Sequence, residues 1–286
     1  MVNKQNIGIL HPGQMGISIA ASAQNSGNHV YWVSAGRSPE THQRASNHAL
    51  LDAQNLRHLC KTCSMILCIC PPHAAEEVAN QVIAEGYEGL YVDANAISPE
   101  RAIHIGKGLQ DAGITFVDGS VIGGPAWQPG RTWLYLSGEG AEQVASCFSS
   151  GPLETQVMDD EIGKASAIKM CFAAYTKGRT ALLSAILGTA EALGVRGELE
   201  NQWSRYWPDF NQETTRRVQV GASKAWRFAG EMEEISATFQ AAGLPGEFHA
   251  AAADLYRRLT QFKDDSSVPL KEILDTLIQS GITSES

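Results

Sequence analysis

The sequence predicts an α/β N-terminal domain with a mostly parallel sheet, followed by an all-α C-terminal domain. Apolar strand signals alternate with helical patterns through the first half of the chain, and a glycine-containing turn follows the first apolar run. From Asp159 onward the alternation stops, and helical spacing continues with no proline between Pro152 and Pro208. We therefore place a first domain at residues 1–159 and a second at residues 160–286.

The composition is that of an ordinary globular protein. Hydrophobic residues make up 43% of the 286 residues, charged residues make up 19%, and only the polar tail at residues 283–286 suggests disorder. The formal net charge is −9 and no basic block occurs, so we expect neither a nucleic acid nor an anionic membrane as partner. No apolar run approaches the ~20 residues of a membrane span, and residues 1–4 contain no apolar leader, so we expect a cytoplasmic protein.

Six cysteines raise the question of a metal or redox site. Cys60 and Cys63 form a Cys-x-x-Cys pair, and Cys68 and Cys70 follow within the apolar run at residues 65–70. That run predicts a buried parallel strand, in which cysteine packs as a small hydrophobic residue. Because no histidine or aspartate supplies a regular ligand spacing, we predict reduced structural thiols and no metal site.

The first strand and helix predict a site for a dinucleotide. The apolar run at residues 7–10 leads into His11, Gly13 and Gly16 and then into a helical pattern of small residues. In such a unit, free backbone N–H groups and the positive end of the helix dipole bind a pyrophosphate. The full pattern is G-x-G-x-x-G, and His11 stands at its first glycine. The candidate cofactor residues of this turn are Gly13, Gln14, Met15 and Gly16.

The end of the second strand bears on the choice between NAD and NADP. After the strand at residues 29–33 the chain continues through Ser34 and Arg37 and has no carboxylate before Glu40. Enzymes selective for NAD place an acidic residue here, on the ribose hydroxyl. A small hydroxyl followed by a guanidinium instead suits a 2′-phosphate, which arginine binds in bidentate fashion. We therefore predict NADP, with NAD as the alternative and a solvated turn residue as the other interpretation of Arg37.

Two further predicted strands end in candidate cofactor contacts. The strand at residues 65–70 ends at Cys70 and Pro71, and the strand at residues 89–92 is followed closely by Asn95. Ligands of open α/β sheets bind at this carboxyl edge, so all three residues are candidates. Asn95 either hydrogen-bonds the ribose on the nicotinamide side or closes an Asx turn.

The next strand, at residues 114–117, delivers the segment 118–124. The adjacent glycines of this segment expose backbone N–H groups that bind a carboxylate, as in an anion nest. Residues 133–136 and 154–158 predict a closing hairpin strand and a last short strand. The candidate substrate residues of this region are Ser120, Gly123 and Gly124.

Lys169 is the candidate for general acid/base chemistry. It lies among apolar and small residues of the C-terminal helical region, where a lysine without a task or a partner is costly. Desolvation would lower its pKa toward neutrality, which suits a general acid or base. Lys177 lies two helical turns further on a similar face and is the competing candidate. The surrounding apolar residues predict a helix that is buried on most faces: Ile162, Ala165, Ile168, Phe172, Tyr175 and Leu182.

Three of these motifs, in this order, resemble the β-hydroxyacid dehydrogenase family, which is related to 6-phosphogluconate dehydrogenase. In the family's catalytic motif, G-x-x-G-x-G-x-x-x-K-x-x-x-N, Gly163 falls on a glycine and Lys169 on the catalytic lysine, whereas Ala165 and Ala173 replace a glycine and the asparagine. In the substrate motif, D-A-P-V-S-G-G, Ile122 replaces the serine. Four residues of that motif agree with the family: Asp118, Val121, Gly123 and Gly124.

The C-terminal third is similar to one branch of this superfamily. The segments 224–235 and 241–245 look like those of phosphogluconate-dehydrogenase-like proteins with a distinctive C-terminal helical domain. Ordinary members carry a Lys-Asp pair where Gly230 and Glu231 stand here. The loss of that lysine, of the asparagine and of the serine indicates a substrate that differs from the usual one.

The resemblance implies an NAD(P)-dependent oxidoreductase that acts on a CH–OH group. Hydride would pass between a nicotinamide and a small hydroxy acid or keto acid, and Lys169 would exchange the proton. Arg227 would add an anion contact from the helical domain, or stack beside Trp226. The resemblance also implies a homodimer that exchanges helices. An imine reductase or reductive aminase, and a non-catalytic NADPH-binding sensor, are the alternatives.

Overall fold

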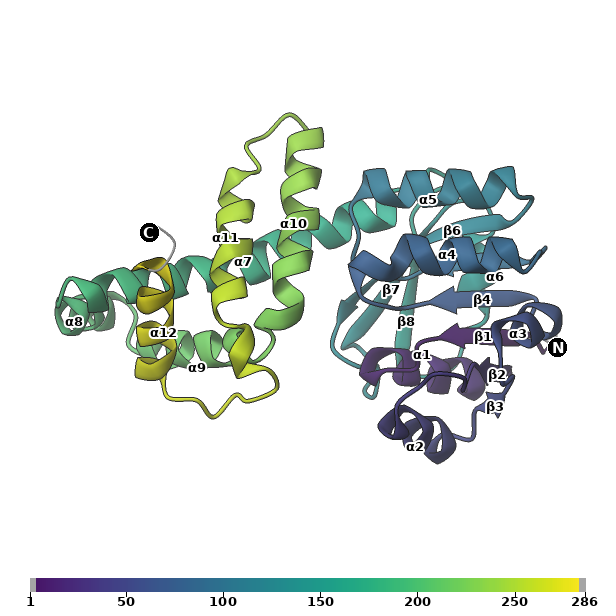
Figure 1. Cartoon of the computed structure of the whole chain (residues 1–286), viewed down its shortest axis with the longest axis horizontal. Helices are drawn as coiled ribbons and strands as arrows, with labels where there is room; N and C mark the ends of the chain where they lie inside the picture. The colour runs from purple at the N-terminus through teal and green to yellow at the C-terminus, as the bar shows by residue number, and fades with distance from the viewer. Residues whose placement is uncertain (1–3, 283–286) are drawn as a thin grey trace. The chain divides into compact units, whose positions relative to one another are not determined.

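A computed structural model describes residues 4–282, so the polar tail predicted at 283–286 lies outside the described residues. The chain divides into two compact units, residues 1–170 and residues 171–286, which Figure 1 shows with their helices and strands labelled. The long helix α7 (Lys164–Ala192) contains the boundary between them. The boundary predicted at 159/160 therefore lies just before this helix, and the division by contacts lies inside it.

The N-terminal unit is built on one eight-stranded sheet with the order β3-β2-β1-β4-β5-β6-β7-β8. The pairs from β3 through β6 are parallel, β7 runs antiparallel to β6, and β8 is parallel to β7. This arrangement confirms the predicted Rossmann-type, mostly parallel sheet. The strands are β1 Asn6–Leu10, β2 His29–Trp32, β3 Leu51–Asp52, β4 Met65–Cys68, β5 Leu90–Asp93, β6 Thr115–Gly123, β7 Thr132–Ser137 and β8 Leu153–Val157.

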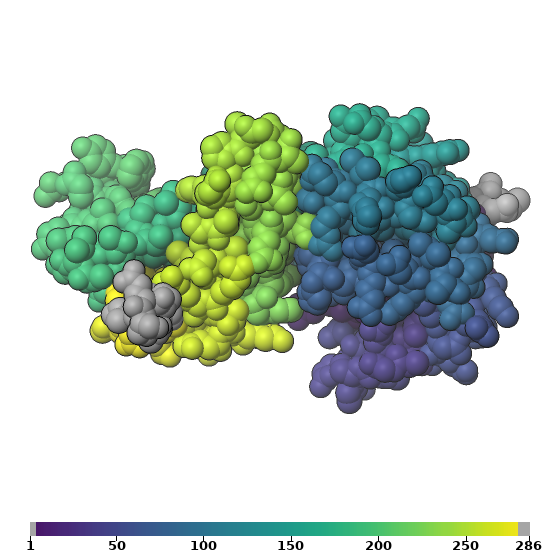
Figure 2. Space-filling view, turned by 45° about the horizontal axis from the view of Figure 1, so that its top comes forward, coloured from purple at the N-terminus to yellow at the C-terminus, as the bar shows by residue number. Residues whose placement is uncertain are grey.

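Helices cover both faces of this sheet, and the strands alternate their side chains between two cores. In β4, Met65 and Leu67 pack in one core with α1 and α6, whereas Ile66 and Cys68 pack in the other with α3, α4 and α5. Figure 1 shows α4 and α5 side by side over the sheet, and Figure 2 shows the surface of this unit in the purple to teal colours of its residues. The helices are α1 Gln14–Asn25, α2 Pro39–Asn47, α3 Leu56–Thr62, α4 Ala75–Ala84, α5 Pro99–Asp111 and α6 Ala141–Ser146, with a short 3₁₀ helix at Pro72–Ala74.

Strand β6 extends beyond the carboxyl edge of its parallel neighbours. Asp118 is the last residue of β6 that pairs with β5, opposite Asp93. From Gly119 to Gly123 the strand pairs with β7 alone. The carboxyl edge is where ligands bind in open α/β sheets, so this extension carries the segment 118–124 into the expected binding region.

The C-terminal unit is entirely helical over its described residues, as the sequence predicts. Helices α10 and α11 lie side by side (Figure 1), and the hydroxyl of Ser236 on α10 donates to the Gly246 carbonyl at 2.9 Å, just before α11 begins. A Cβ at Gly246 would lie 2.6 Å from the Ser236 carbonyl oxygen, so the turn requires glycine. The helices after α7 are α8 Arg196–Tyr206, α9 Phe210–Ser223, α10 Ala225–Ala241, α11 Glu247–Arg258 and α12 Leu270–Ile282, with a short 3₁₀ helix at Thr260–Phe262.

The prediction that the helix around Lys169 is buried on most faces is wrong for this single chain. Phe172, Tyr175 and Leu182 expose 47%, 62% and 45% of their surface, whereas Ala165 is fully buried. The apolar residues do recur at helical spacing, but this chain covers only part of the helix. Among the described residues, no helix is both long and apolar enough to cross a bilayer.

Candidate active site

The turn between β1 and α1 leads into a helix N-terminus, and the Gly13 N–H just before the helix donates to the His11 carbonyl at 2.7 Å. Gly13 and Gln14 are exposed, and Gly13 precedes α1 without a side-chain cap and with no acidic residue in the first turn of the helix. Gly16 is buried, and a Cβ there would lie 2.7 Å from the His11 carbonyl oxygen. The turn therefore fits the phosphates of a dinucleotide, with Gly16 required for close packing and Gly13 for the approach of a ligand. Met15 is half-buried beside them.

Two arginines lie near this turn, of which the sequence indicated one. Arg37 follows β2 and is half-buried, as is Ser34. Burial lowers the pKa of Arg37, and the nearby thiols of Cys68 and Cys70 act in the opposite direction. The second is Arg44 on α2, whose guanidinium donates to the Pro12 carbonyl at 3.2 Å. Arg44 was missed because no helix was predicted at residues 39–47.

Asn95 joins the ends of β4 and β5. Its side-chain oxygen accepts a hydrogen bond from the backbone N–H of Cys70, and its amide nitrogen lies 3.7 Å from the Cys68 sulfur. Its backbone N–H donates to the Asp93 carboxylate at 2.9 Å. Asn95 is buried, so its immediate effect is to fix the loop that contains Cys70 and Pro71, which are half-buried and exposed respectively. The predicted Asx turn is present here, but the Asp93 carboxylate forms it rather than the Asn95 side chain.

Asp93 is a buried carboxyl group at this edge. Desolvation raises its pKa to about 7, opposed by the hydrogen bonds from Asn95. One of its oxygens is buried without a hydrogen-bond partner among the described residues. A buried carboxyl group in such surroundings is predominantly protonated below neutral pH, which reduces the cost of its burial.

Asp118 anchors the start of the helix that carries Lys169. One of its oxygens accepts hydrogen bonds from the backbone N–H groups of Gly163 and Ser166, each at 3.0 Å, and from the hydroxyl of Ser137 at 3.2 Å. The other accepts from the Ser166 hydroxyl at 2.7 Å. Burial raises the pKa of Asp118, and these bonds oppose the rise. The aspartate of the substrate motif therefore binds the first turn of α7, a role that the sequence did not reveal.

Lys169 reaches the extension of β6. Its Nζ donates to the Val121 carbonyl at 2.6 Å, and its side chain is half-buried. Val121 lies between Ser120 and Ile122 on the segment of β6 that continues past β5. The amine thus lies at the carboxyl edge of the sheet, next to the predicted substrate strand, rather than in bulk solvent.

The three predicted substrate residues in and just after β6 differ in their exposure and in the space around them. The hydroxyl of Ser120 is fully buried and has no hydrogen-bond partner among the described residues. Gly124 is exposed with open space around it, whereas Gly123 has a φ of +123° and a Cβ there would lie 2.3 Å from the Arg131 carbonyl oxygen. Gly123 is therefore required by the turn into β7, whatever it binds.

Lys177, the competing candidate, has a partner in the C-terminal unit. Its amine forms an ion pair and hydrogen bond with the Glu231 carboxylate, and both side chains are largely buried. It also lies 5.1 Å from the centre of the Phe228 ring, while its backbone carbonyl accepts from the Tyr256 hydroxyl at 2.8 Å. Lys177 thus holds helices α7, α10 and α11 together.

Arg227 is exposed on α10 and does not stack on Trp226. Its guanidinium lies 5.4 Å from the centre of the Phe228 ring, and Lys263 lies over the Trp226 ring instead, at 4.5 Å. Desolvation lowers the pKa of the neighbouring Lys224, and the charges of Arg227 and Lys177 lower it further. Lys177 is paired with Glu231, so the exposed cations of this region are Lys224 and Arg227, which suit contact with an anion.

Comparison with known proteins identifies both parts of the chain. Residues 6–146 match the NAD-binding domain of 6-phosphogluconate dehydrogenase, and residues 190–259 match a domain of unknown function, DUF1932. An uncharacterised 28.5 kDa protein from Methanothermus fervidus is 29% identical over 166 residues, or 57% of this chain. The matched part of the chain spans only 62% of the length of that relative.

Solved structures share the fold over nearly the whole chain. A 3-hydroxyisobutyrate dehydrogenase from Mycobacterium tuberculosis, studied with L-serine, has a TM-score of 0.71 at 15% identity and covers 96% of this chain and 99% of its own. An imine reductase variant from Myxococcus stipitatus with NAD⁺ has a TM-score of 0.56 at 16% identity, with 95% and 99% covered. A reductive aminase from Aspergillus terreus with NADPH and ethyl levulinate has a TM-score of 0.55 at 14% identity, with 96% and 99% covered.

The glycine turn and Asp118 both lie within residues 6–146, which match the NAD-binding domain. Helix α7, which Asp118 anchors, leads into residues 190–259, which match DUF1932. The N-terminal part of the chain is therefore similar to the NAD-binding domain of 6-phosphogluconate dehydrogenase, its C-terminal helices are similar to the DUF1932 domain, and its fold is shared with 3-hydroxyisobutyrate dehydrogenase.

Proposed function

We propose that this chain is an NAD(P)-dependent oxidoreductase that interconverts a small hydroxy acid and a keto acid, with Lys169 as general acid/base. The observation that carries the proposal is the 2.6 Å contact between the Lys169 amine and the Val121 carbonyl on the extension of β6. That contact holds the amine beside Ser120 and the two glycines, at the edge where ligands of this fold bind. The similarity to 3-hydroxyisobutyrate dehydrogenase supports the substrate class.

The residues of the site have separate roles in this reaction. A bound nicotinamide supplies or accepts the hydride. Lys169 takes the hydroxyl proton during oxidation and returns it to the carbonyl oxygen during reduction. The Ser120 hydroxyl and the N–H of Gly124 would orient the substrate carboxylate, and Arg227 stays a separate candidate anion contact of the helical unit. Replacement of the family serine by Ile122 and of the asparagine by Ala173 removes two polar side chains from the site. The substrate therefore needs fewer polar groups to pair with them.

NADP is the cofactor we propose, with NAD as the alternative. Gly13, Gln14, Met15 and Gly16 would hold the pyrophosphate at the start of α1. Ser34 and Arg37 would bind the 2′-phosphate, and Arg44 on α2 lies close to the same turn. Cys70, Pro71 and Asn95 would line the nicotinamide side of the carboxyl edge. Solved structures of this fold hold either dinucleotide, NAD⁺ in the imine reductase and NADPH in the reductive aminase.

A homodimer is part of the proposal. Exposed apolar side chains gather on α7, α8 and the loops that flank α8, within the helical unit, and a second copy of the chain would bury them. These residues are Phe172, Tyr175, Leu182, Leu193, Val195, Tyr206 and Trp207.

The second candidate is an imine reductase or reductive aminase. The similarity to both kinds of enzyme favours it, and Ala173, which is 1% exposed, leaves no polar side chain where hydroxyacid dehydrogenases have asparagine. Both reactions use a nicotinamide as hydride donor and need a proton donor for the oxygen or nitrogen bonded to the reacting carbon. Lys169 therefore has the same role in each.

A substrate panel separates these functions. The purified chain is mixed with NADPH or NADH and keto acids, with and without added amines, and with NADP⁺ or NAD⁺ and hydroxy acids. We expect turnover with a keto acid alone and with its hydroxy acid in reverse, faster with the phosphorylated dinucleotide. Turnover only when an amine is present would establish the imine reductase. Dinucleotide binding without turnover of any substrate would favour the non-catalytic sensor.

A further inference from the structure

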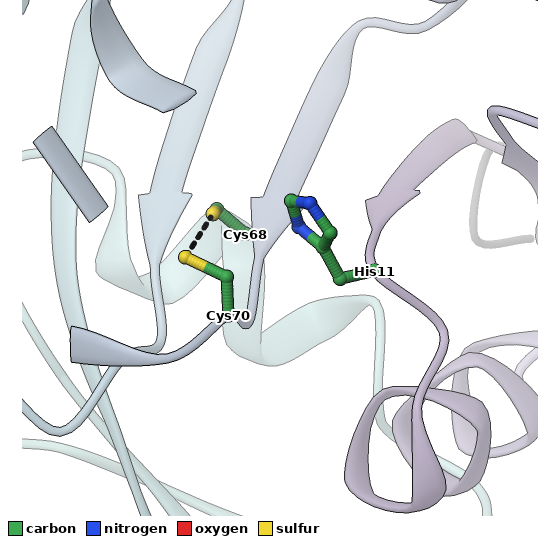
Figure 3. A group of neighbouring side chains, drawn as sticks. All are labelled: His11, Cys68 and Cys70. Carbon is green, nitrogen blue, oxygen red and sulfur yellow. Dashed lines mark hydrogen bonds between the residues drawn. The ribbon is translucent and has the colours of Figure 1, made fainter. Parts of the chain in front are cut away.

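Three side chains with metal-binding donors meet at the carboxyl edge of β1 and β4. The imidazole of His11 comes from the turn after β1, and the thiols of Cys68 and Cys70 come from the end of β4 and the loop after it (Figure 3). One ligand atom from each residue lies within 4.8 Å of the other two. The sequence argument against a metal rested on the absence of a histidine at regular spacing, and the fold supplies one from 57 positions earlier in the chain than Cys68.

The spacing of the two thiols matches a tetrahedral ion. The sulfurs lie 3.7 Å apart, and both cysteines are free. A tetrahedral zinc ion with Zn–S bonds of about 2.3 Å separates two sulfur ligands by about 3.8 Å. The same geometry requires an N···S separation of about 3.6 Å, and the His11 nitrogen lies within 4.8 Å of both sulfurs.

His11 is turned toward this position by an unusual backbone. Its φ of +68° belongs to the left-handed region, which a glycine at the first position of the G-x-G-x-x-G pattern would enter more readily. Its Nδ1 is buried and has no hydrogen-bond partner among the described residues. A buried nitrogen without a partner is costly, and a bound cation would remove that cost.

The surroundings hold the two thiols in place. Asn95 accepts a hydrogen bond from the Cys70 backbone N–H, and its amide nitrogen lies 3.7 Å from the Cys68 sulfur. Arg37 interacts electrostatically with both thiols. Such outer-shell partners orient metal ligands and raise affinity. Two thiolates would neutralise a divalent cation, and no ligand of the set is of the hard oxygen type that Mg²⁺ or Ca²⁺ prefers.

We propose that His11, Cys68 and Cys70 bind a soft divalent cation, with Zn²⁺ as the ion that fits, and with solvent in the fourth position. Coordination releases the thiol protons to solvent as the two metal–sulfur bonds form. None of its three ligands takes part in the proposed proton transfer, although Cys70 is also a residue that we place on the nicotinamide side of the cofactor site.

The test uses the full chain, reduced and freed of metal with a chelator, with Co²⁺ alone and Zn²⁺ alone as probes. We expect one Co²⁺ per chain, with the charge-transfer absorption of thiolate ligands and the visible bands of a tetrahedral ion, and displacement by Zn²⁺. His11→Gly restores the glycine of the pattern, and Cys70→Ser removes one sulfur. Each should weaken Zn²⁺ binding by more than the roughly 10- to 100-fold that loss of an outer-shell partner costs.

The double variant Cys60→Ser/Cys63→Ser is the matched control, because it removes two thiols outside the cluster and should bind Zn²⁺ as the parent chain does. Far-UV circular dichroism checks that each variant is folded, and His11→Gly alone suffices if Cys70→Ser does not fold. Absence of metal uptake by the parent chain, uptake that survives His11→Gly, or loss of uptake in the control would each overturn the proposal.

Discussion

The two glycines of the first turn, Gly13 and Gly16, differ in the space that a side chain would find at each position. A Cβ at Gly16 would lie 2.7 Å from the His11 carbonyl oxygen and 3.0 Å from the Ile69 side chain, whereas at Gly13 the nearest such atom is 4.0 Å away. Gly16 therefore serves the packing of the protein itself. Gly13 leaves room for a ligand to approach the backbone.

Gly16→Ala should lower the free energy of unfolding by about 1–3 kcal/mol, as overpacking in a well-packed site does. Gly13→Ala should leave the unfolding free energy within about 0.5 kcal/mol of the parent value and weaken dinucleotide binding. Denaturant unfolding and dinucleotide titration of both variants measure these effects. Equal loss of stability in the two variants would contradict the assignment of Gly16 to packing and of Gly13 to the approach of a ligand.

Asp93 gives the protein a pH-dependent stability. Because burial raises its pKa from 3.8 to about 7, the folded state holds a proton between those values that the unfolded chain has released. The resulting stabilisation is complete below about pH 4 and is lost as the pH rises to about 7. Asp93→Asn should therefore flatten the fall in unfolding free energy between pH 5 and pH 8, measured by denaturant unfolding with a chelator present. An unchanged slope would mean that Asp93 titrates normally.

At the scale of elements, the alternation of strands and helices was predictable because apolar runs and helical spacing are local signals. The sequence did not reveal α2 or β3, since α2 has one buried residue, Ala45, and β3 is two exposed residues long. Arg44 was missed with α2. The partners of Asp118 and Lys177 were not predictable either, because they lie 19 to 54 positions away along the chain.

The Lys177–Glu231 pair is the main polar link among the helices of the C-terminal unit. Lys177→Ala should destabilise that unit by about 3–5 kcal/mol, because it removes the cation that is paired with the largely buried Glu231 carboxylate. The double variant Lys177→Met/Glu231→Leu should recover most of this loss. Thermal and denaturant unfolding of the three proteins provide the comparison. If the double variant is no more stable than Lys177→Ala, packing rather than charge explains the effect.

At the scale of the molecule, the exposed apolar residues of the helical unit form the dimer interface that we propose. Leu182 exposes 45% of its surface on α7, and an aspartate there would place a charge in the proposed dimer interface. Leu182→Asp should shift the protein from dimer to monomer in size-exclusion chromatography with light scattering. Gln261→Asp, at an exposed polar position outside this group of residues, should remain dimeric. A monomeric parent chain would contradict the proposal.

The central claim is that Lys169 transfers the proton of the catalysed reaction, and one variant tests it most directly. With the substrate identified by the panel, Lys169→Ala should lower kcat by roughly 10²- to 10⁴-fold and leave dinucleotide affinity nearly unchanged. Lys164→Ala, at the start of the same helix where the lysine pairs with Glu161, should retain activity. Full activity of Lys169→Ala, or a loss of kcat as large in Lys164→Ala, would contradict the assignment.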